Sequence, residues 1–213
     1  MNNTREMSSN QLETLYRVMM KRIAKGLSAE KLSFLIGRAP DYISNIEMLH
    51  TRPYSITELK CIASALEEKN FKTFFPDLDD YTMVNVMMES EVYGNRLMHT
   101  CAIISGEHKK QTYFTLQEDA RQEVPLIEID KDIKTVKEEV KIARDAIKLL
   151  ISADYFFEPR LPVHICQSIN RFLKIIVSPA YIEQVLNSFC KDNAAAVLKK
   201  EEKGKHGFYY VAA

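Results

Sequence analysis

Two glycines, Gly26 and Gly37, constrain the fold most, because each ends a short segment whose apolar residues have helical spacing. A second helix begins after Ser28, a suitable N-cap, and ends at Gly37. The sequence therefore predicts two short helices separated by a turn. In the first helix, residues 11–25, the apolar residues recur every three or four positions, namely Leu12, Leu15, Val18, Met19 and Ile23.

Two further helices are predicted before residue 67. One follows the turn that contains Gly37 and carries Ile43 and Ile46 at a spacing of three. The other, "SITELKCIASALEEK", opens with a capping box formed by Ser55 and Glu58. We predict a four-helix domain over residues 1–76 in which the second and third helices form a helix-turn-helix. The apolar face of the fourth helix consists of Ile56, Leu59, Ile62, Ala63 and Leu66.

This segment resembles the phage-repressor and Cro type of helix-turn-helix, the Xre family. The resemblance lies in "KGLSAEKLSFLIG", "YISNIE", Pro53, "ELKCIASAL" and "FKTFFP", and it covers residues 11–76 in order and spacing. It implies double-stranded DNA as partner, transcriptional control as function, and a homodimer on two-fold half-sites about one helical turn apart.

The start of the third helix departs from the family. Ala29 stands where Gln is common, and Pro40 and Asp41 stand where polar base-reading residues are common. We place Pro40 at the first helical position, where its missing N–H is no loss, and Asp41 beside it suits the helix dipole. As an alternative, the helix-turn-helix frame survives as a scaffold for protein interaction or oligomerisation, without sequence-specific DNA reading.

The resemblance implies two sets of DNA contacts. The recognition helix and turn would supply Arg38, Asp41, Tyr42, Ser44 and Asn45. The contacts to the DNA backbone would come from Arg22, Lys25, Ser28, Lys31, His50 and Arg52. As an alternative, Arg38, Lys25 and Lys31 are ordinary solvated charges, and Tyr42 packs against the second helix. Glu47 is expected to pair locally and not to contact a partner.

Residues 77–130 are acidic and have the pattern of strands. They carry a formal net charge of −7, between +3 for residues 1–76 and +4 for residues 131–213. "TMVNVMMESEV", "RLMHTCAIIS", "QTYFTLQ" and "PLIEI" predict a small antiparallel meander with a turn at Gly94 and Asn95. Such a sheet needs a cover, either a helix of the same chain or a second subunit.

Residues 131–213 predict three helices and a hairpin. The long helix that begins at Ile133 has a heptad-like apolar seam, which serves either packing within the domain or dimerisation. "VHICQSINRFL" and "SPAYIEQVLNSFCKD" follow as helices, and "AAVLKK" and "GFYYVA" as strands. This order is that of a winged helix, whose wing would contact DNA or protein. The wing lysines are Lys199, Lys200, Lys203 and Lys205.

The sequence carries no sign of catalysis. Phosphate-binding glycine loops, nucleophile elbows and zinc-protease motifs are absent, so we expect no enzyme. The four cysteines form no C-x-x-C pair and are expected to be reduced and buried, without a metal or other cofactor. His164 and Cys166 are interpreted as core residues.

The complete prediction is a mainly α protein with a small antiparallel β-sheet. An Xre-like domain spans residues 1–76, a β-meander residues 77–130, and a winged-helix-like domain residues 131–213. The chain has no long apolar run and no signal-peptide pattern at residues 1–10, so we expect a cytoplasmic protein without a membrane partner. A small-molecule effector is neither predicted nor excluded.

Overall fold

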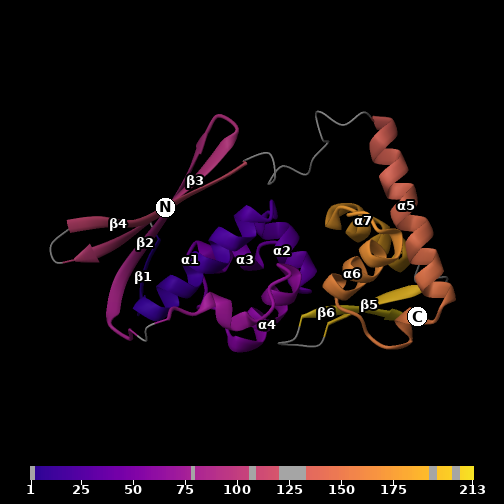
Figure 1. Ribbon diagram of the computed structural model, residues 1–213, viewed down its shortest axis with the longest axis horizontal. Helices are drawn as coiled ribbons and strands as arrows, with labels where there is room; N and C mark the ends of the chain where they lie inside the picture. The colour runs from indigo at the N-terminus through magenta and orange to yellow at the C-terminus, as the bar shows by residue number, and fades with distance from the viewer. Residues whose placement is uncertain (1–2, 78–79, 106–108, 120–132, 192–195, 203–206) are drawn as a thin grey trace. The chain divides into compact units, whose positions relative to one another are not determined.

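The computed structural model describes residues 3–77, 80–105, 109–119, 133–191, 196–202 and 207–213. The chain divides into two compact units: residues 1–32 with 40–126, and residues 33–39 with 127–213. The described residues form seven α-helices and two antiparallel sheets, so the fold is mixed α/β (Figure 1). The prediction of a mainly α protein is wrong, because six strands in two sheets lie beside the helices in the part of the chain that the structure describes.

The first four helices of the chain are those that the sequence predicts, and the boundary between the two units after Leu32 falls inside the second of them. They are α1 (Ser9–Ala24), α2 (Ala29–Leu35), α3 (Tyr42–Glu47) and α4 (Ile56–Ala65), followed by the 3-10 helix η1 (Phe71–Phe74). Gly26 and Gly37, at φ of 65° and 71°, have the left-handed conformation that glycine adopts without steric cost. The Ser55–Glu58 capping box is formed. The predicted helix ends and caps are therefore confirmed.

Two details of these helices differ from the prediction. Helix α3 begins at Tyr42, with Asp41 as its N-cap residue, so Pro40 lies before the helix and not at its first position. The Asp41 carbonyl accepts the first intrahelical hydrogen bond, from Asn45 N at 2.8 Å. Ile56 is 58% exposed, because the inward face of α4 starts only at Glu58 and Leu59.

The larger sheet has the strand order β1-β2-β3-β4, antiparallel throughout. Strands β2 (Met83–Tyr93), β3 (Arg96–Ser105) and β4 (Lys109–Asp119) confirm three strands of the predicted meander, with its turn at Gly94. The sequence did not predict β1 (Asn3–Ser8), which pairs with β2. The expected strand "PLIEI" lies outside the described residues.

One face of this sheet is covered by helices of the same chain. Val86, Met88, Cys101 and Phe114 on the sheet belong to one buried cluster with apolar residues of α1 and α3. The first of the two expected covers, a helix of the same chain, is therefore the one present. The helix residues of the cluster are Leu12, Leu15, Met19 and Ile46.

The other unit contains α5 (Ile133–Ser152), the 3-10 helix η3 (Tyr155–Phe157), α6 (Pro162–Leu173) and α7 (Pro179–Cys190). The antiparallel strands β5 (Leu198–Glu202) and β6 (Phe208–Ala212) complete it. This element order is the predicted one, and α5 packs against α7 within the unit. The segment 33–39 belongs here, since Phe208 N donates to Gly37 O at 2.7 Å.

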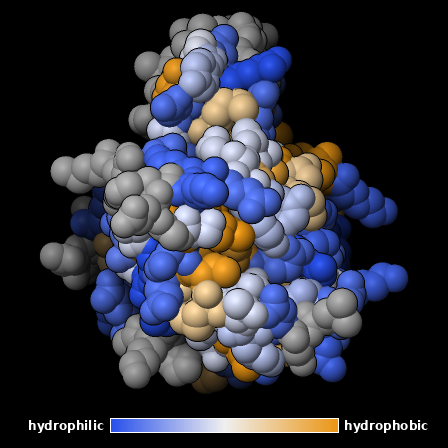
Figure 2. Space-filling model, turned by 90° about the vertical axis from the view of Figure 1, so that its left-hand side faces the viewer, coloured by the Kyte–Doolittle hydropathy of each residue, from blue (hydrophilic) through white to orange (hydrophobic). Residues whose placement is uncertain are grey.

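On the side drawn in Figure 2, apolar side chains lie near the centre of the face and toward its upper right, with hydrophilic side chains around them. Among the described helices, none has the length and apolar character needed to cross a membrane.

Candidate functional site

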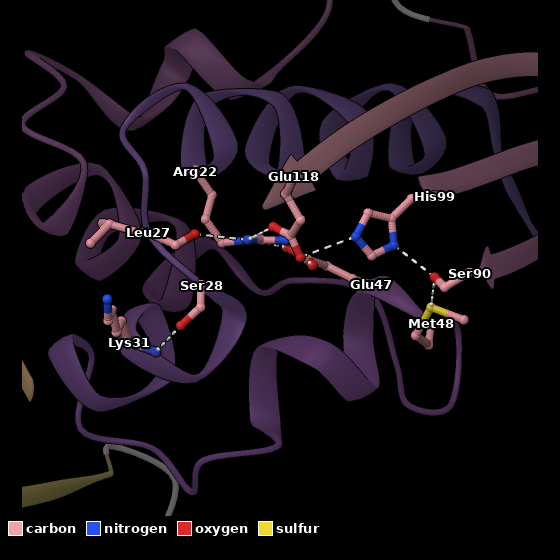
Figure 3. A network of polar contacts seen from close by, with 9 residues as sticks. All are labelled: Arg22, Leu27, Ser28, Lys31, Glu47, Met48, Ser90, His99 and Glu118. Carbon is pink, nitrogen blue, oxygen red and sulfur yellow. Dashed lines mark hydrogen bonds and ion pairs between the residues drawn. The ribbon is translucent and has the colours of Figure 1, made fainter. Parts of the chain in front are cut away.

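Arg22 lies at the centre of a buried network and not on the surface (Figure 3). Its Nε and Nη2 atoms donate to the two carboxylate oxygens of Glu47 at 2.8 and 2.7 Å. Its Nη1 atom donates to Glu118 Oε2 at 2.5 Å and to Leu27 O at 2.8 Å. A fully buried guanidinium cannot reach a phosphate, so the predicted backbone contact by Arg22 is wrong.

The network continues from Arg22 into the sheet. Glu118 Oε1 on β4 lies 3.1 Å from His99 Nε2 on β3, and His99 Nδ1 lies 2.7 Å from Ser90 Oγ on β2. The Ser90 hydroxyl also donates to Met48 Sδ at 3.1 Å, next to the end of α3. We call Arg22, Glu47, His99 and Glu118 the buried network.

The neighbouring charges of the buried network shift the pKa values of Arg22 and Glu118. Burial alone would lower the pKa of Arg22, but the carboxylates of Glu47 and Glu118 raise it above its ordinary value. Burial would raise the pKa of Glu118, but His99 and Arg22 lower it. Glu47 therefore does pair within the chain as expected, although its partner comes from α1. The network holds the C-terminal end of α3 against α1 and the sheet.

A second cluster lies at the start of α4, and we call it the surface cluster: Tyr42, Arg52, Ser55 and Glu58. Arg52 donates to both Glu58 oxygens, at 3.1 and 2.9 Å, and the Tyr42 hydroxyl donates to the same carboxylate. Ser55 N and Oγ each donate to Glu58 Oε2 at 2.7 Å. Burial would raise the pKa of Glu58, but these hydrogen bonds lower it to about 2.

The surface cluster changes the roles predicted for Tyr42 and Arg52. The Tyr42 hydroxyl donates to Glu58 of α4 and its ring packs on the core cluster, so this hydroxyl already has a partner within the chain. The Arg52 side chain is 58% exposed, although it is paired, and so stays accessible to a phosphate.

The remaining contacts predicted in the N-terminal unit divide between surface and interior. Ser28 is buried, and its Oγ accepts from Lys31 N at 3.2 Å, so it is a helix cap and the predicted DNA contact is wrong. The Lys31 side chain is half-buried. Lys25 is exposed, and its Nζ lies 2.8 Å from Glu67 Oε2.

Polar groups follow one another along the accessible side of α3. Asn45 Nδ2 donates to Asp41 Oδ2 at 2.8 Å, and Asn45 Oδ1 lies 3.2 Å from His50 Nδ1. Asp41 and His50 are exposed, and Ser44 is half-buried. These four residues form the polar edge of α3, the part of the predicted recognition surface that the structure brings together.

The other predicted contacts belong to the second unit. Arg38 lies in the segment 33–39 and is half-buried. Lys199 and Lys200 are exposed on β5, and the Lys200 ammonium lies 3.7 Å from the centre of the Phe208 ring, a cation–π contact. Lys203 and Lys205 lie outside the described residues.

The thiols and histidines give no metal site in the part of the chain that the structure describes. Cys101 and Cys166 are buried, and burial raises the pKa of each thiol to about 12. Cys61 and Cys190 are only half-buried. His164 is exposed on α6, so its interpretation as a core residue is wrong.

Comparison with known protein families, with curated proteins and with solved structures finds no match to this chain. The functional argument therefore depends on the residues themselves. Sequence analysis missed Glu118 and His99, which no local pattern connects to Arg22. The burial of Arg22 itself had a signal, since Arg22 follows Val18 by four positions and Met19 by three on the apolar face of α1.

Proposed function

We propose that the protein binds double-stranded DNA through α3 and the residues that follow it, and that it regulates transcription as a dimer. The observation that carries the proposal is the way α3 is held. Arg22 and Glu47 fix its buried side with two hydrogen bonds, while the polar edge of α3 stays accessible. A helix held in this way loses little conformational entropy when it enters a groove.

The contacts available to DNA follow from this arrangement. Asn45 can present its amide to an adenine edge once it leaves Asp41 and His50, an exchange that costs little at an exposed site. Within the described residues, the hydrogen bonds of Arg52 to Glu58 and Pro53 use three of its five N–H groups. The others suit a phosphate oxygen, and Lys25 can exchange Glu67 for a second phosphate.

The second unit enters the proposal as a winged helix. Lys199 and Lys200 on β5 supply exposed cations for a further DNA or protein contact. The element order of three helices and a hairpin supports this assignment.

A second candidate function is a protein-interaction module built on the same frame. The observation in its favour is that carboxylates of the chain itself already occupy several predicted contacts. Arg22 is bound to Glu47 and Glu118, and Tyr42 and Arg52 are bound to Glu58. On this alternative, Asp41 and the rest of the polar edge meet a protein partner.

Fluorescence anisotropy with duplex fragments from the protein's own promoter region separates the two functions. When a protein binds DNA through phosphate contacts, the logarithm of its association constant falls linearly with the logarithm of the salt concentration. The slope is about −0.9 for each phosphate contact. We expect such a loss between low and physiological salt. Absence of binding to every duplex at low salt would refute the proposed function and leave the interaction module.

Single variants locate the interface. Arg52→Ala should weaken DNA binding at every sequence and reduce the salt slope by about one unit. The matched control is Lys72→Ala, which removes one exposed cation from η1. Asn45→Ala should reduce discrimination at one base pair by about tenfold, in line with the loss of one amide–base contact. Equal effects of Arg52→Ala and Lys72→Ala would show that α3 is not the interface.

A further inference from the structure

A pocket of about 320 Å³ opens within the N-terminal unit. Its walls come from β1 and α1, from the end of α3, the loop to α4 and α4 itself, and from Phe75, Pro76 and Tyr81. Drug-sized and cofactor-sized ligands occupy pockets of roughly 300–1,000 Å³, so the space suits a small organic molecule. The pocket is separate from the polar edge of α3 and from the surface cluster.

The lining of the pocket is uncharged. Among the described residues that line it, none is Asp, Glu, Lys, Arg or His. Met7, Leu15, Ile46 and Leu59 give it apolar walls. A charged ligand would lose its hydration here without a partner of opposite charge, which is costly. An uncharged, mainly apolar ligand fits this lining.

Leu49 lines the pocket in an unusual backbone conformation. Its φ of 63° is left-handed, in the position after a helix where glycine is common. A residue with a Cβ is disfavoured there, and Leu49 keeps its side chain in the core cluster that includes Ile46. The pocket wall is therefore held by packing and does not depend on a flexible turn.

We propose that this pocket binds an uncharged, mainly apolar small molecule. The proposal does not depend on DNA binding. A bound ligand would touch Ile46, in the last turn of α3, and Leu49, which follows the helix.

Two naphthalene probes test the proposal on the full chain by fluorescence titration. 2-Naphthol is uncharged, and 2-naphthoate is anionic. We expect saturable binding of one 2-naphthol per chain, and at least about tenfold weaker binding of 2-naphthoate because its charge is not compensated. Equal binding of the two, or no saturable binding of 2-naphthol, would overturn the proposal.

Thr51→Trp locates the bound probe. Thr51 is an exposed residue of the pocket wall, and an indole there fills the opening. The variant should bind 2-naphthol at least about tenfold more weakly, while Thr57→Trp, an exposed change on α4 outside the pocket, should bind as before. Thermal melting of both variants shows whether they fold. Unchanged binding by folded Thr51→Trp would place the probe elsewhere and refute the site.

Discussion

The buried network and the surface cluster use the same chemistry in different surroundings. In each, an arginine forms two hydrogen bonds to one carboxylate, Arg22 to Glu47 and Arg52 to Glu58. Arg22 is completely buried, whereas the Arg52 side chain is 58% exposed. The exposed arginine can add or exchange a partner, and the buried one cannot. Exposure, more than residue type, therefore separates the cations that stabilise the fold from those available to a ligand.

The two clusters also differ in what remains when the arginine is removed. Without Arg22, Glu47 and Glu118 would lie buried, and only His99 would face Glu118. Without Arg52, Glu58 would keep the hydrogen bonds from Tyr42 and Ser55. The first loss leaves carboxylates without compensation in a low-dielectric interior, and the second does not.

The largest expected effect is that of Arg22→Ala. It should lower the free energy of unfolding by about 3–5 kcal/mol, the usual cost of breaking a buried ion pair from one side. Arg52→Ala should cost about 1 kcal/mol or less, as partly exposed pairs do. Urea denaturation of both variants measures the difference. Equal losses would remove the distinction between the two clusters.

A triple variant separates charge from packing in the buried network. Arg22→Met keeps most of the side-chain volume, and Glu47→Gln with Glu118→Gln then removes the uncompensated charges. If charge dominates, the triple variant should be more stable than Arg22→Met alone, because neutral amides cost less to bury than carboxylates. A triple variant no more stable than the single one would assign the loss to packing.

The next effect concerns acid stability. The pKa of Glu58 is lowered from 4.5 to about 2 in the folded protein, so its contribution is fully present above pH 4.5 and is lost as the pH falls toward 2. Urea unfolding at pH 6 and in the acid range should show a smaller loss for Glu58→Gln than for the natural chain. An identical acid dependence would show that Glu58 is not the group responsible.

Local patterns predicted those parts of the fold that short stretches of chain determine. The ends of α1 and α2 follow from Gly26 and Gly37, and the start of α4 follows from the Ser55–Glu58 capping box. Strand β1 had no such signal, because "NTREMS" becomes a strand only by pairing with β2, about 80 residues further on.

The candidate site was predicted less well for the same physical reason. The partners of Arg22 are 25 and 96 residues away, so a surface position for this cation could not be excluded by composition. The Tyr42 hydroxyl turns to Glu58 across the loop to α4, which helical spacing alone does not show. Ser44 and Asn45 were expected on the outer side of the helix from the apolar positions Ile43 and Ile46, and both are partly exposed. The contacts of Asn45 with Asp41 and His50 were not predicted.

The smallest expected effect on stability is that of replacing Lys25, the C-cap residue of α1, which forms an exposed ion pair with Glu67. Its side chain is 44% exposed and that of Glu67 is 71% exposed, so Lys25→Ala should change the free energy of unfolding by no more than about 0.5 kcal/mol.

DNA affinity gives the sharper measurement. If Lys25 exchanges Glu67 for a phosphate, Lys25→Ala should weaken DNA binding. Glu67→Gln should strengthen DNA binding, because Lys25 then has no ion pair to break before it binds the phosphate. Both changes should shrink at high salt. The same direction of change in both variants would show that Lys25 makes no phosphate contact and that the exposed pair, like the buried network, serves only the fold.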